Sequence, residues 1–301
     1  MSMISATLVR DLREKTGVGM MECKKALEEN QGDVEKAIVW LRERGMSRAA
    51  RKADRVASEG IVQVLVSPDQ KSGVLVEVNC ETDFVSRNPD FLSFAHSVAE
   101  IALKGQVKDV EALGEAHLEK AGTKVSEQLA TLISTIGENM KLRRLERVSV
   151  INGVVEGYSH MGGKIGTLVA LEGGQDAKAQ EVAKDLAMHV AAAAPKYLDS
   201  SKVDAAEIEQ ERGIARKKLL EEGKPENLIE KILEGQIKKL FKEVCLVEQA
   251  FVKDPNVTVT KYVQSAGAQL KVAGFVRFAL GEGIEKKTEN FADEVAAQLR
   301  K

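Results

Sequence analysis

Two segments of the chain, 93 positions apart, repeat one pattern of glycine and aliphatic residues. In the first copy Gly60-Ile-Val-Gln leads to Gly73-Val-Leu-Val-Glu-Val, and in the second Gly153-Val-Val-Glu leads to Gly166-Thr-Leu-Val-Ala-Leu. Each copy predicts a strand, a turn, a second strand and a loop, and an alanine-rich helix follows in both. A solenoid needs at least three repeats, so two copies predict a duplicated α+β core instead.

The first 45 residues predict three short helices. Ser5 can cap the first helix and Thr16-Gly17 ends it, while Asp33 caps the third helix and Gly45 closes it. A bundle this small buries little area and would be only marginally stable alone. Three-helix units of this kind usually serve as docking modules, and we expect that role here.

A basic stretch with several small residues, RERGMSRAARKADR, occupies positions 42–55. One interpretation is a linker that contacts RNA or a partner protein, and the other is a solvated connecting helix. The second is favoured, because a run of charges usually marks a solvated face.

The C-terminal half predicts a charged helical hairpin. One arm covers residues 203–222, Gly223-Lys224-Pro225 turns the chain, and the other arm covers residues 226–241. In one interpretation the two arms of the hairpin pack only against each other on the protein surface. In the other, the hairpin protrudes as an arm for self-association or for a partner. The other predicted elements are a helical segment over 111–139, a strand over 270–280 and an amphipathic helix from Glu289 to Leu299.

Composition excludes several classes of protein. Lys and Arg number 44 against 46 Asp and Glu, so no global field draws the chain to nucleic acid or anionic lipid. The longest apolar stretch is far shorter than the roughly 20 residues that span a bilayer, and the N-terminus is expected to begin a fold rather than a signal peptide. Three widely spaced cysteines without a CxxC motif indicate a reducing compartment and neither disulfides nor a zinc site. We therefore expect a cytoplasmic protein that does not bind membranes.

No motif for covalent chemistry stands out. The four histidines do not pair with a cysteine or carboxylate at metal-ligand or catalytic-triad spacing. Gly162-Gly-Lys-Ile-Gly lacks the order of a phosphate-binding loop and lies in a predicted hairpin turn. His160 lies at the tip of that hairpin, where a solvated turn residue is the favoured interpretation and a partner contact is the alternative. The chain is therefore predicted to be no enzyme and to need no cofactor or metal.

One loop contains an aromatic residue in a chain that has few. Aromatic residues make up 4% of the sequence, yet Phe84 falls in the segment Thr82-Asp83-Phe84-Val85, before a predicted helix that Asn88 caps. Phe84 is either a plug folded under that helix or an anchor that enters a pocket on another protein, and spacing alone favours the plug. Asp83 either caps a local turn, the favoured interpretation, or brings a charge to an ion site of a partner.

Four segments carry a more specific signal. They are Leu12-Arg-Glu-Lys-Thr-Gly-Val-Gly-Met-Met-Glu-Cys-Lys-Lys-Ala-Leu27, Glu77-Val-Asn-Cys-Glu-Thr-Asp-Phe-Val85, Ile136-Gly-Glu-Asn-Met-Lys-Leu-Arg-Arg144, and Gly274-Phe-Val-Arg-Phe with Gly281-Glu-Gly-Ile-Glu-Lys. Together they resemble the bacterial translation elongation factor Ts family, and the match covers essentially the whole chain. The resemblance implies guanine-nucleotide exchange on elongation factor Tu, which would be bound in its GDP-bound and nucleotide-free states and would release GDP so that GTP can bind.

The resemblance also implies roles for individual residues. Asp83 and Phe84, within the loop Thr82–Val85, would push into the G domain of the partner and disturb its Mg²⁺ and phosphate binding. The further partner contacts that it implies are Arg13, Met20, Met21 and His160. The helical hairpin would allow self-association, which it mediates in some members of the family.

The fold that the resemblance implies is α+β. It comprises a ubiquitin-associated-like (UBA-like) three-helix bundle, a duplicated α+β core, an inserted helical hairpin and a C-terminal helix. The predicted parts are the UBA-like domain with its basic linker (1–56), the core N-subdomain (57–149), the core C-subdomain (150–198 and 242–285), the coiled-coil hairpin (199–241) and the C-terminal helical module (286–301).

Two rival classes are less well supported. An RNA-binding or ribosome-binding protein would use Arg44–Arg55 and Lys141–Arg147, but the near-neutral charge and the lack of an RNP-type strand count against it. We therefore expect no direct contact with nucleic acid. A hydrolase or transferase would need a catalytic set of residues, and the sequence shows none at the required spacing.

Overall fold

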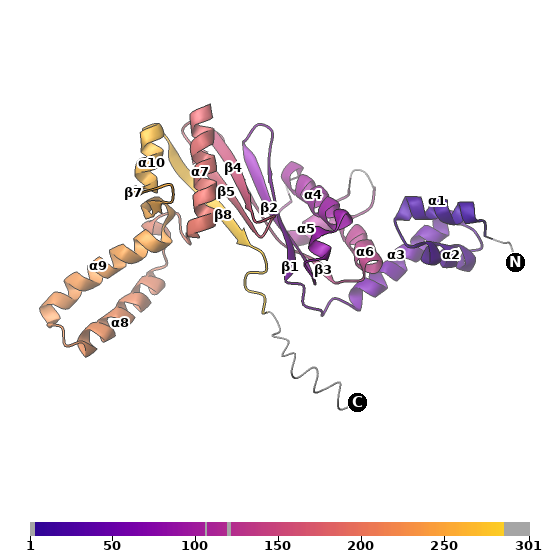
Figure 1. Ribbon diagram of the computed structural model, residues 1–301, viewed down its shortest axis with the longest axis horizontal. Coiled ribbons are helices and arrows are strands. Elements are labelled where there is room, and N and C mark those ends of the chain that lie inside the picture. The colour runs from indigo at the N-terminus through magenta and orange to yellow at the C-terminus, as the bar shows by residue number, and fades with distance from the viewer. Residues whose placement is uncertain (1–3, 106, 119–121, 286–301) are drawn as a thin grey trace. The chain divides into compact units, whose positions relative to one another are not determined.

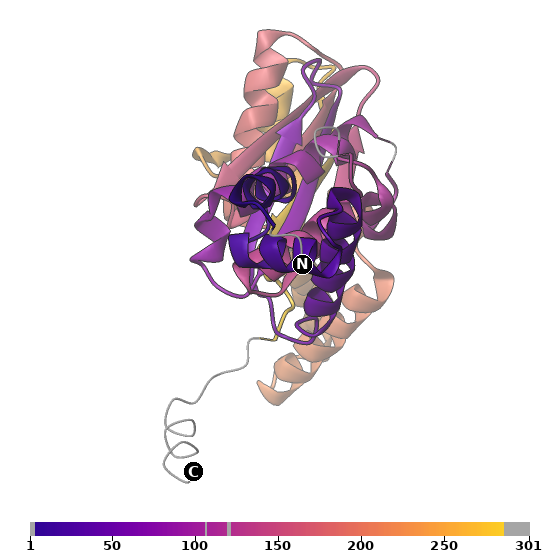
Figure 2. The ribbon, with the colours of Figure 1, turned by 90° about the vertical axis from the view of Figure 1, so that its right-hand side faces the viewer.

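The computed structural model describes residues 4–105, 107–118 and 122–285, which divide into two compact units. Among these residues, the first unit contains 4–63, 76–105, 107–118, 122–145 and 279–285, and the second contains 64–75 and 146–278. Both units combine helices with strands (Figure 1, Figure 2), so the predicted α+β class is confirmed.

Three helices open the first unit: α1 (Ala6–Thr16), α2 (Met20–Glu29) and α3 (Val34–Ala50). The predicted caps are present, because Ser5 accepts the N–H of Leu8 and the Asp33 carboxylate accepts the N–H of Lys36. Gly17 ends α1 in the left-handed conformation, with φ 68°. The residues buried between the three helices are Val9, Leu12, Cys23, Ala26, Leu27, Ala37 and Leu41.

The predicted end of the third helix at Gly45 is wrong, because α3 continues to Ala50. Gly45 is buried, and a β-carbon on it would lie 3.8 Å from the carbonyl oxygen of Ala130, on α6 (Val125–Ile136). This glycine therefore allows two helices to approach closely and does not terminate one.

A three-stranded sheet has more than half of each of its strands in the first unit. Its order is β1 (Glu59–Val66), β2 (Ser72–Cys80) and β3 (Met140–Ser149). The short helix η1 (Val85–Arg87) and the helix α4 (Pro89–Lys104) follow β2. The buried residues of α4 are Phe91, Phe94, Ala95, Val98, Ala99 and Ala102.

The segment 111–139 is not the single helical stretch that its pattern predicts. It contains α5 (Val110–Glu115) and α6, and an isolated bridge pairs His117 with Lys124 between them. Gly137 ends α6 in the left-handed conformation, with φ 92°. The strand β3 that follows was not predicted, since four of its ten residues are Lys or Arg and hide the apolar alternation of a strand.

The second unit has a sheet in the order β4 (Gly153–His160), β5 (Ile165–Glu172) and β8 (Lys271–Ala279). The strands β4 and β5 are antiparallel and pair from Gly153 with Glu172 to His160 with Ile165. The helix α7 (Ala177–Ala193) packs on this sheet (Figure 1). The strand–turn–strand–loop–helix order predicted for both repeats is therefore confirmed, in β1–β2–α4 and in β4–β5–α7.

The predicted helical hairpin is also present in the second unit. Its arms are α8 (Ala205–Glu221) and α9 (Glu226–Val244), which bury Leu219, Ile229 and Leu233 between them. The other elements of this unit are η2 (Ser200–Lys202), η3 (Leu246–Glu248), β6 (Ala250–Phe251), β7 (Asp254–Thr258) and α10 (Val259–Ala266). The helix predicted from Glu289 to Leu299 lies outside the described residues. Among the residues that are described, no helix has the length and apolarity needed to cross a membrane.

Candidate functional site

The loop between β2 and α4 folds into a tight turn of its own. Residues 85–87 form η1, and three backbone hydrogen bonds within residues 82–88 close the turn. Asn88 caps α4 as predicted, because its Oδ1 accepts the N–H of Asp90 at 2.8 Å. The loop is therefore an ordered turn between a strand and a capped helix.

Phe84 and Val85 lie on opposite sides of this turn. The Phe84 side chain is 82% exposed, whereas Val85 is 7% exposed. The favoured interpretation of Phe84 as a plug is therefore wrong, because Val85 takes the buried position. An aromatic ring held in water forgoes hydrophobic free energy that burial in a partner would provide.

Thr82 fixes the start of the turn. Its backbone N–H donates to Oε2 of Glu138 at 3.0 Å, and its hydroxyl donates to Oε1 of the same carboxylate at 2.7 Å. Glu138 directly follows Gly137, the residue that ends α6. Sequence reasoning did not single out Glu138, although the helix-ending glycine before it marks a defined turn at this position.

Asp83 and Arg87 form an exposed ion pair on the outer side of the turn. Nη2 of Arg87 donates to Oδ2 of Asp83 at 3.0 Å, and neither side chain is buried. Such a pair contributes little to stability, about 0–1 kcal/mol. The Asp83 carboxylate can therefore change partners at low cost.

A fully buried carboxylate, Glu77, supports the strand that precedes the loop. Its oxygens accept hydrogen bonds from Nη1 of Arg143 at 2.9 Å, from Nε of Arg144 at 2.6 Å and from the backbone N–H of Gly281 at 2.8 Å. Burial on its own raises the pKa of Glu77, but the hydrogen bonds from Gly281, Arg143 and Arg144 together outweigh it and hold the pKa below its ordinary value. The sequence signal for this buried carboxylate is a charged residue between two valines, Val76 and Val78, inside a strand.

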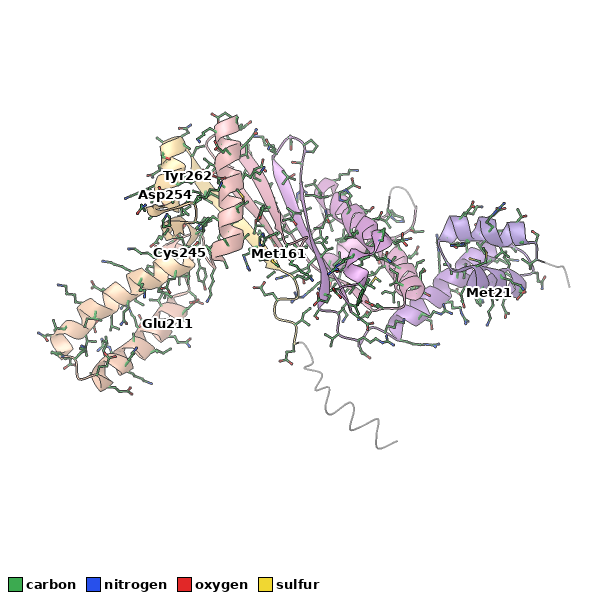
Figure 3. All side chains as sticks on the ribbon, viewed as in Figure 1. Met21, Met161, Glu211, Cys245, Asp254 and Tyr262 are labelled. Carbon is green, nitrogen blue, oxygen red and sulfur yellow. The ribbon has the colours of Figure 1, made fainter. Side chains whose placement is uncertain are left out.

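The N-terminal residues implied by the resemblance lie on the first two helices. Arg13 is an exposed residue of α1, and Met20 and Met21 are exposed neighbours at the start of α2. Met21, labelled in Figure 3, is 73% exposed. Exposed methionines are adaptable apolar contacts, which suits a binding surface.

The basic residues of 42–55 face carboxylates of the first unit. The ion pairs are Arg42–Glu127, Arg44–Glu22, Arg48–Glu22 and Arg55–Glu81, with distances between 2.9 and 3.6 Å. The segment is helical only as far as Ala50, and its arginines pair with α2, with α6 and with Glu81, the residue after β2.

His160 lies in the second unit at the tip of the β4–β5 hairpin, as predicted. It is exposed, and its Nδ1 shares a hydrogen bond of 2.9 Å with the Tyr158 hydroxyl. The next residue, Met161, which is labelled in Figure 3, is also exposed. Its φ is 50°. The tip therefore presents an imidazole beside a flexible apolar side chain.

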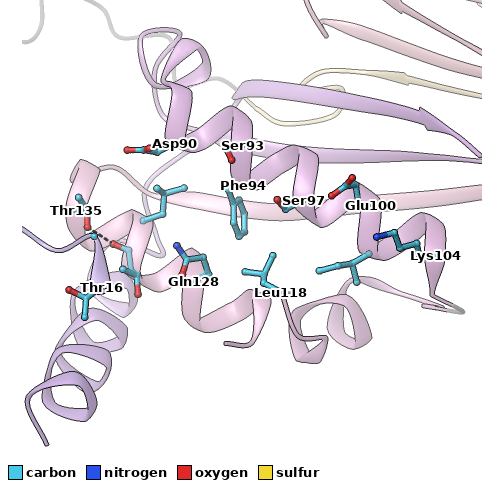
Figure 4. A pocket seen from close by; sticks show the side chains of 14 residues that line it. Thr16, Asp90, Ser93, Phe94, Ser97, Glu100, Lys104, Leu118, Gln128 and Thr135 are labelled. Carbon is cyan, nitrogen blue, oxygen red and sulfur yellow. Dashed lines mark hydrogen bonds between the residues drawn. The ribbon is translucent and has the colours of Figure 1, made fainter. Parts of the chain in front are cut away.

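A cavity of about 340 Å³ lies in the first unit between the end of α1, one face of α4 and α6 (Figure 4). Its wall mixes the ring of Phe94 with the hydroxyls of Ser93 and Ser97, and Glu100 and Lys104 lie at one end. In the parts of the chain that the structure describes, no group of three or more His, Cys, Asp or Glu side chains could hold a metal ion.

Comparison with known proteins identifies the family. A family model described as elongation factor TS matches residues 81–282. The elongation factor Ts of Clostridium botulinum (strain Alaska E43 / Type E3) is 51% identical, with 99% of this chain and 100% of that protein covered. The elongation factor Ts of Clostridium perfringens (strain SM101 / Type A) is 50% identical over 98% of both chains. The chain therefore belongs to the elongation factor Ts family, whose members take part in translation as guanine-nucleotide exchange factors for elongation factor Tu and are not enzymes.

Proposed function

We propose that this protein releases GDP from elongation factor Tu by inserting Phe84 and Asp83 of the loop Thr82–Val85 into the G domain of its partner. The observation that supports the proposal is the 82% exposure of Phe84 on an ordered turn. Val85 and Thr82 hold that turn from its inner side, so the ring is presented outward before the partner arrives.

Exchange requires contacts that distinguish two states of the partner. By linkage, a factor that binds the nucleotide-free partner more tightly weakens nucleotide binding by the same ratio. A ring inserted between partner elements supplies such a differential contact. Each 1.4 kcal/mol of difference corresponds to about tenfold in nucleotide affinity, so a few well-placed contacts are sufficient.

Asp83 adds an electrostatic contribution in the proposed complex. Its carboxylate forms an exposed pair with Arg87, which is easily exchanged for contacts with a partner. A negative charge brought next to a nucleotide site competes with the phosphates for Mg²⁺ and for the groups that order it. We therefore assign Phe84 the steric part of the exchange and Asp83 the electrostatic part.

The other proposed contacts lie on both units. Arg13, Met20 and Met21 would bind the partner through the N-terminal helices, and His160 would bind it through the hairpin tip. Their exposure in the free protein supports these roles. We expect them to contribute more to affinity than to the rate of nucleotide release, because the disturbance of the nucleotide site comes from the loop.

We propose the following domain organisation. Its parts are a UBA-like domain (1–56), a core N-subdomain (57–149), a core C-subdomain (150–198 and 242–285), an inserted coiled-coil hairpin (199–241) and a C-terminal module (286–301). The repeated order β1–β2–α4 and β4–β5–α7 supports a duplicated core. Exposed apolar residues on the hairpin, Ile214, Leu220 and Leu228, support self-association through it.

The experiment is release of labelled GDP from purified elongation factor Tu over a range of concentrations of this protein. Phe84→Ala and Asp83→Ala should lower the maximal release rate much more than they weaken complex formation. Ile151→Ala is the matched control, because Ile151 is 97% exposed but lies outside the proposed contacts. Wild-type rates in both loop variants would refute the loop assignment, and no stimulation by the wild-type protein would refute the function.

A further inference from the structure

We propose that Glu138 is a positioning residue for nucleotide exchange. Its carboxylate clamps Thr82 and thereby holds Phe84 and Asp83 in the outward conformation that enters the partner. The inference rests on the function proposed above and assigns to it a residue that lies outside the loop.

The clamp uses both oxygens of one carboxylate. Oε2 of Glu138 accepts the backbone N–H of Thr82 at 3.0 Å, and Oε1 accepts its hydroxyl at 2.7 Å. Hydrogen bonds to an ionised acceptor are shorter and stronger than those between neutral groups. Two of them on one residue fix both its position and its rotation.

The remaining polar atoms of Thr82 connect the clamp to the turn. Its carbonyl oxygen accepts the thiol of Cys80 at 3.1 Å and the N–H of Ser86 at 3.3 Å, and its Oγ1 accepts the N–H of Val85 at 3.4 Å. The bonds from Ser86 and Val85 to Thr82 connect residues before and after Phe84 in the chain. A displacement of Thr82 would therefore change the direction of the Phe84 ring.

Glu138 is itself held in a defined place. Gly137 before it has a φ of 92°, a conformation that residues with a β-carbon rarely adopt. Asn139 after it is buried, donates its N–H to Oε1 of Glu81 at 2.5 Å and donates its side-chain amide to the carbonyl oxygen of Arg55 at 2.7 Å. The carboxylate therefore projects from a rigid support that also includes the segment after α3.

The loop needs a clamp because it buries little apolar surface of its own. Phe84 is exposed and adds no packing of its own, so Val85 is the one buried apolar side chain among the four loop residues. A loop with so little buried surface samples other conformations unless polar contacts hold it. Ordering it only on binding would reduce the fraction of encounters that open the nucleotide site.

The test compares Glu138→Ala with Glu127→Ala, which removes a carboxylate of α6 that pairs with Arg42. Glu138→Ala should lower the maximal rate of GDP release about tenfold, the loss expected for hydrogen bonds to a charged group. The concentration that gives half-maximal release should change less than about twofold, because the other contacts remain. Glu127→Ala should leave both quantities at the wild-type values.

Variants of Thr82 separate a positioning role from general loss of structure. Thr82→Ser keeps both hydrogen bonds and should retain the wild-type rate. Thr82→Val keeps the backbone bond to Glu138 but loses the hydroxyl, which donates to Glu138 and accepts from the N–H of Val85, so its maximal rate should be below that of the wild type. A double-mutant cycle between Glu138→Ala and Thr82→Val should be non-additive, since the two changes remove the same bond. Circular dichroism melting excludes variants that fail to fold, and Glu138→Gln then replaces Glu138→Ala with a smaller expected loss.

One measurement without the partner tests the clamp independently of exchange. Hydrogen exchange of the backbone amides in residues 82–86 should be faster in Glu138→Ala than in the wild-type protein, and unchanged in Glu127→Ala. Wild-type protection of this segment, or a wild-type maximal rate in folded Glu138→Ala, would overturn the proposal. If Phe84→Ala released GDP at the wild-type rate while Glu138→Ala exposed the segment, the proposed function would fail and the clamp geometry would stand.

Discussion

Gly60 lies so close to Val78 that a β-carbon on Gly60 would stand 2.1 Å from the Val78 carbonyl oxygen. The same relationship recurs 93 positions later, where a β-carbon on Gly153 would stand 2.0 Å from the carbonyl oxygen of Leu171. Each pair lies within one unit and joins the first strand of its hairpin to the second. The two repeats therefore share a steric requirement as well as a pattern of apolar residues.

We predict that Gly60→Ala destabilises the protein by about 3 kcal/mol, because a backbone clash and a φ of 134° oppose a β-carbon at the same position. Gly153→Ala should have a similar effect through its clash. Gly235→Ala, in the middle of α9 with open space around it, should instead stabilise by about 0.5–1 kcal/mol. Urea unfolding followed by circular dichroism measures all three, and equal effects at Gly60 and Gly235 would contradict the steric explanation.

Local signals predicted the elements whose ends are set by neighbouring residues. Asn88 and Asp33 cap the helices that they were expected to cap, and Gly17 ends α1, because these hydrogen bonds and dihedral angles involve residues close in sequence. The repeat predicted both β-hairpins for a similar reason: the apolar runs and the turn between them are contiguous.

Features that depend on distant residues were not predicted. Gly45 resembles a helix end but lies against Ala130, and Phe84 resembles a plug because the sequence does not reveal that Val85 fills the buried position. The clamp between Thr82 and Glu138 joins residues 56 positions apart, so no local pattern indicates it. Tertiary contacts override local propensity at these positions.

We predict that Glu77→Gln destabilises the first unit by about 3 kcal/mol, because it leaves Arg143 and Arg144 facing a buried neutral group. The pKa of Glu77 in the folded protein lies below its ordinary value of 4.5. The stabilisation that the Glu77 charge provides is therefore complete above pH 4.5, and it is lost as the pH falls through the pKa of the folded protein. Urea unfolding midpoints between pH 6 and 3, read from the single Trp40 of this unit, should fall steeply in the wild type.

The same titration in Glu77→Gln should be flatter, because the group that takes up the proton is gone. Glu172→Gln is the control: Glu172 forms an exposed pair with Lys271 in the second unit. It should leave the Trp40 transition at the wild-type midpoint at every pH. A profile for Glu77→Gln that parallels the wild type would show that other carboxylates govern the acid sensitivity.

We predict that the second unit loses stability as the pH falls below 6.5. Burial lowers the pKa of His189, and although a hydrogen bond with Gln249 opposes this effect, the folded value remains below the ordinary one. As the pH falls, His189 therefore takes up a proton in the unfolded chain before it does so in the folded protein. The free energy of unfolding decreases by up to about 1.4 kcal/mol per pH unit until the pH reaches the pKa of His189 in the folded protein.

Tyrosine fluorescence measures this transition, since all three tyrosines lie in the second unit. His189→Gln should be less stable at pH 7.5 but should show a smaller decrease between pH 6.5 and 5.5, because it no longer titrates. His96→Gln replaces an exposed histidine of the first unit and should leave the decrease unchanged. If His189→Gln lost as much stability between pH 6.5 and 5.5 as the wild type, the pH dependence would come from another titrating group.

The last prediction concerns self-association through the hairpin. The inner face of α8 and α9 is filled by Leu219, Ile229 and Leu233, whereas Leu220 and Leu228 expose apolar surface outward. If that surface buries against a second copy, Leu220→Lys combined with Leu228→Lys should weaken dimerisation more than tenfold, because each buried leucine contributes about 1.5–3 kcal/mol. Sedimentation equilibrium measures the dissociation constant, and Ile151→Lys changes an exposed apolar residue elsewhere as the control. Because the inner face is untouched, the double variant should keep the wild-type melting curve at low protein concentration, and an unchanged dissociation constant would assign self-association to a different surface.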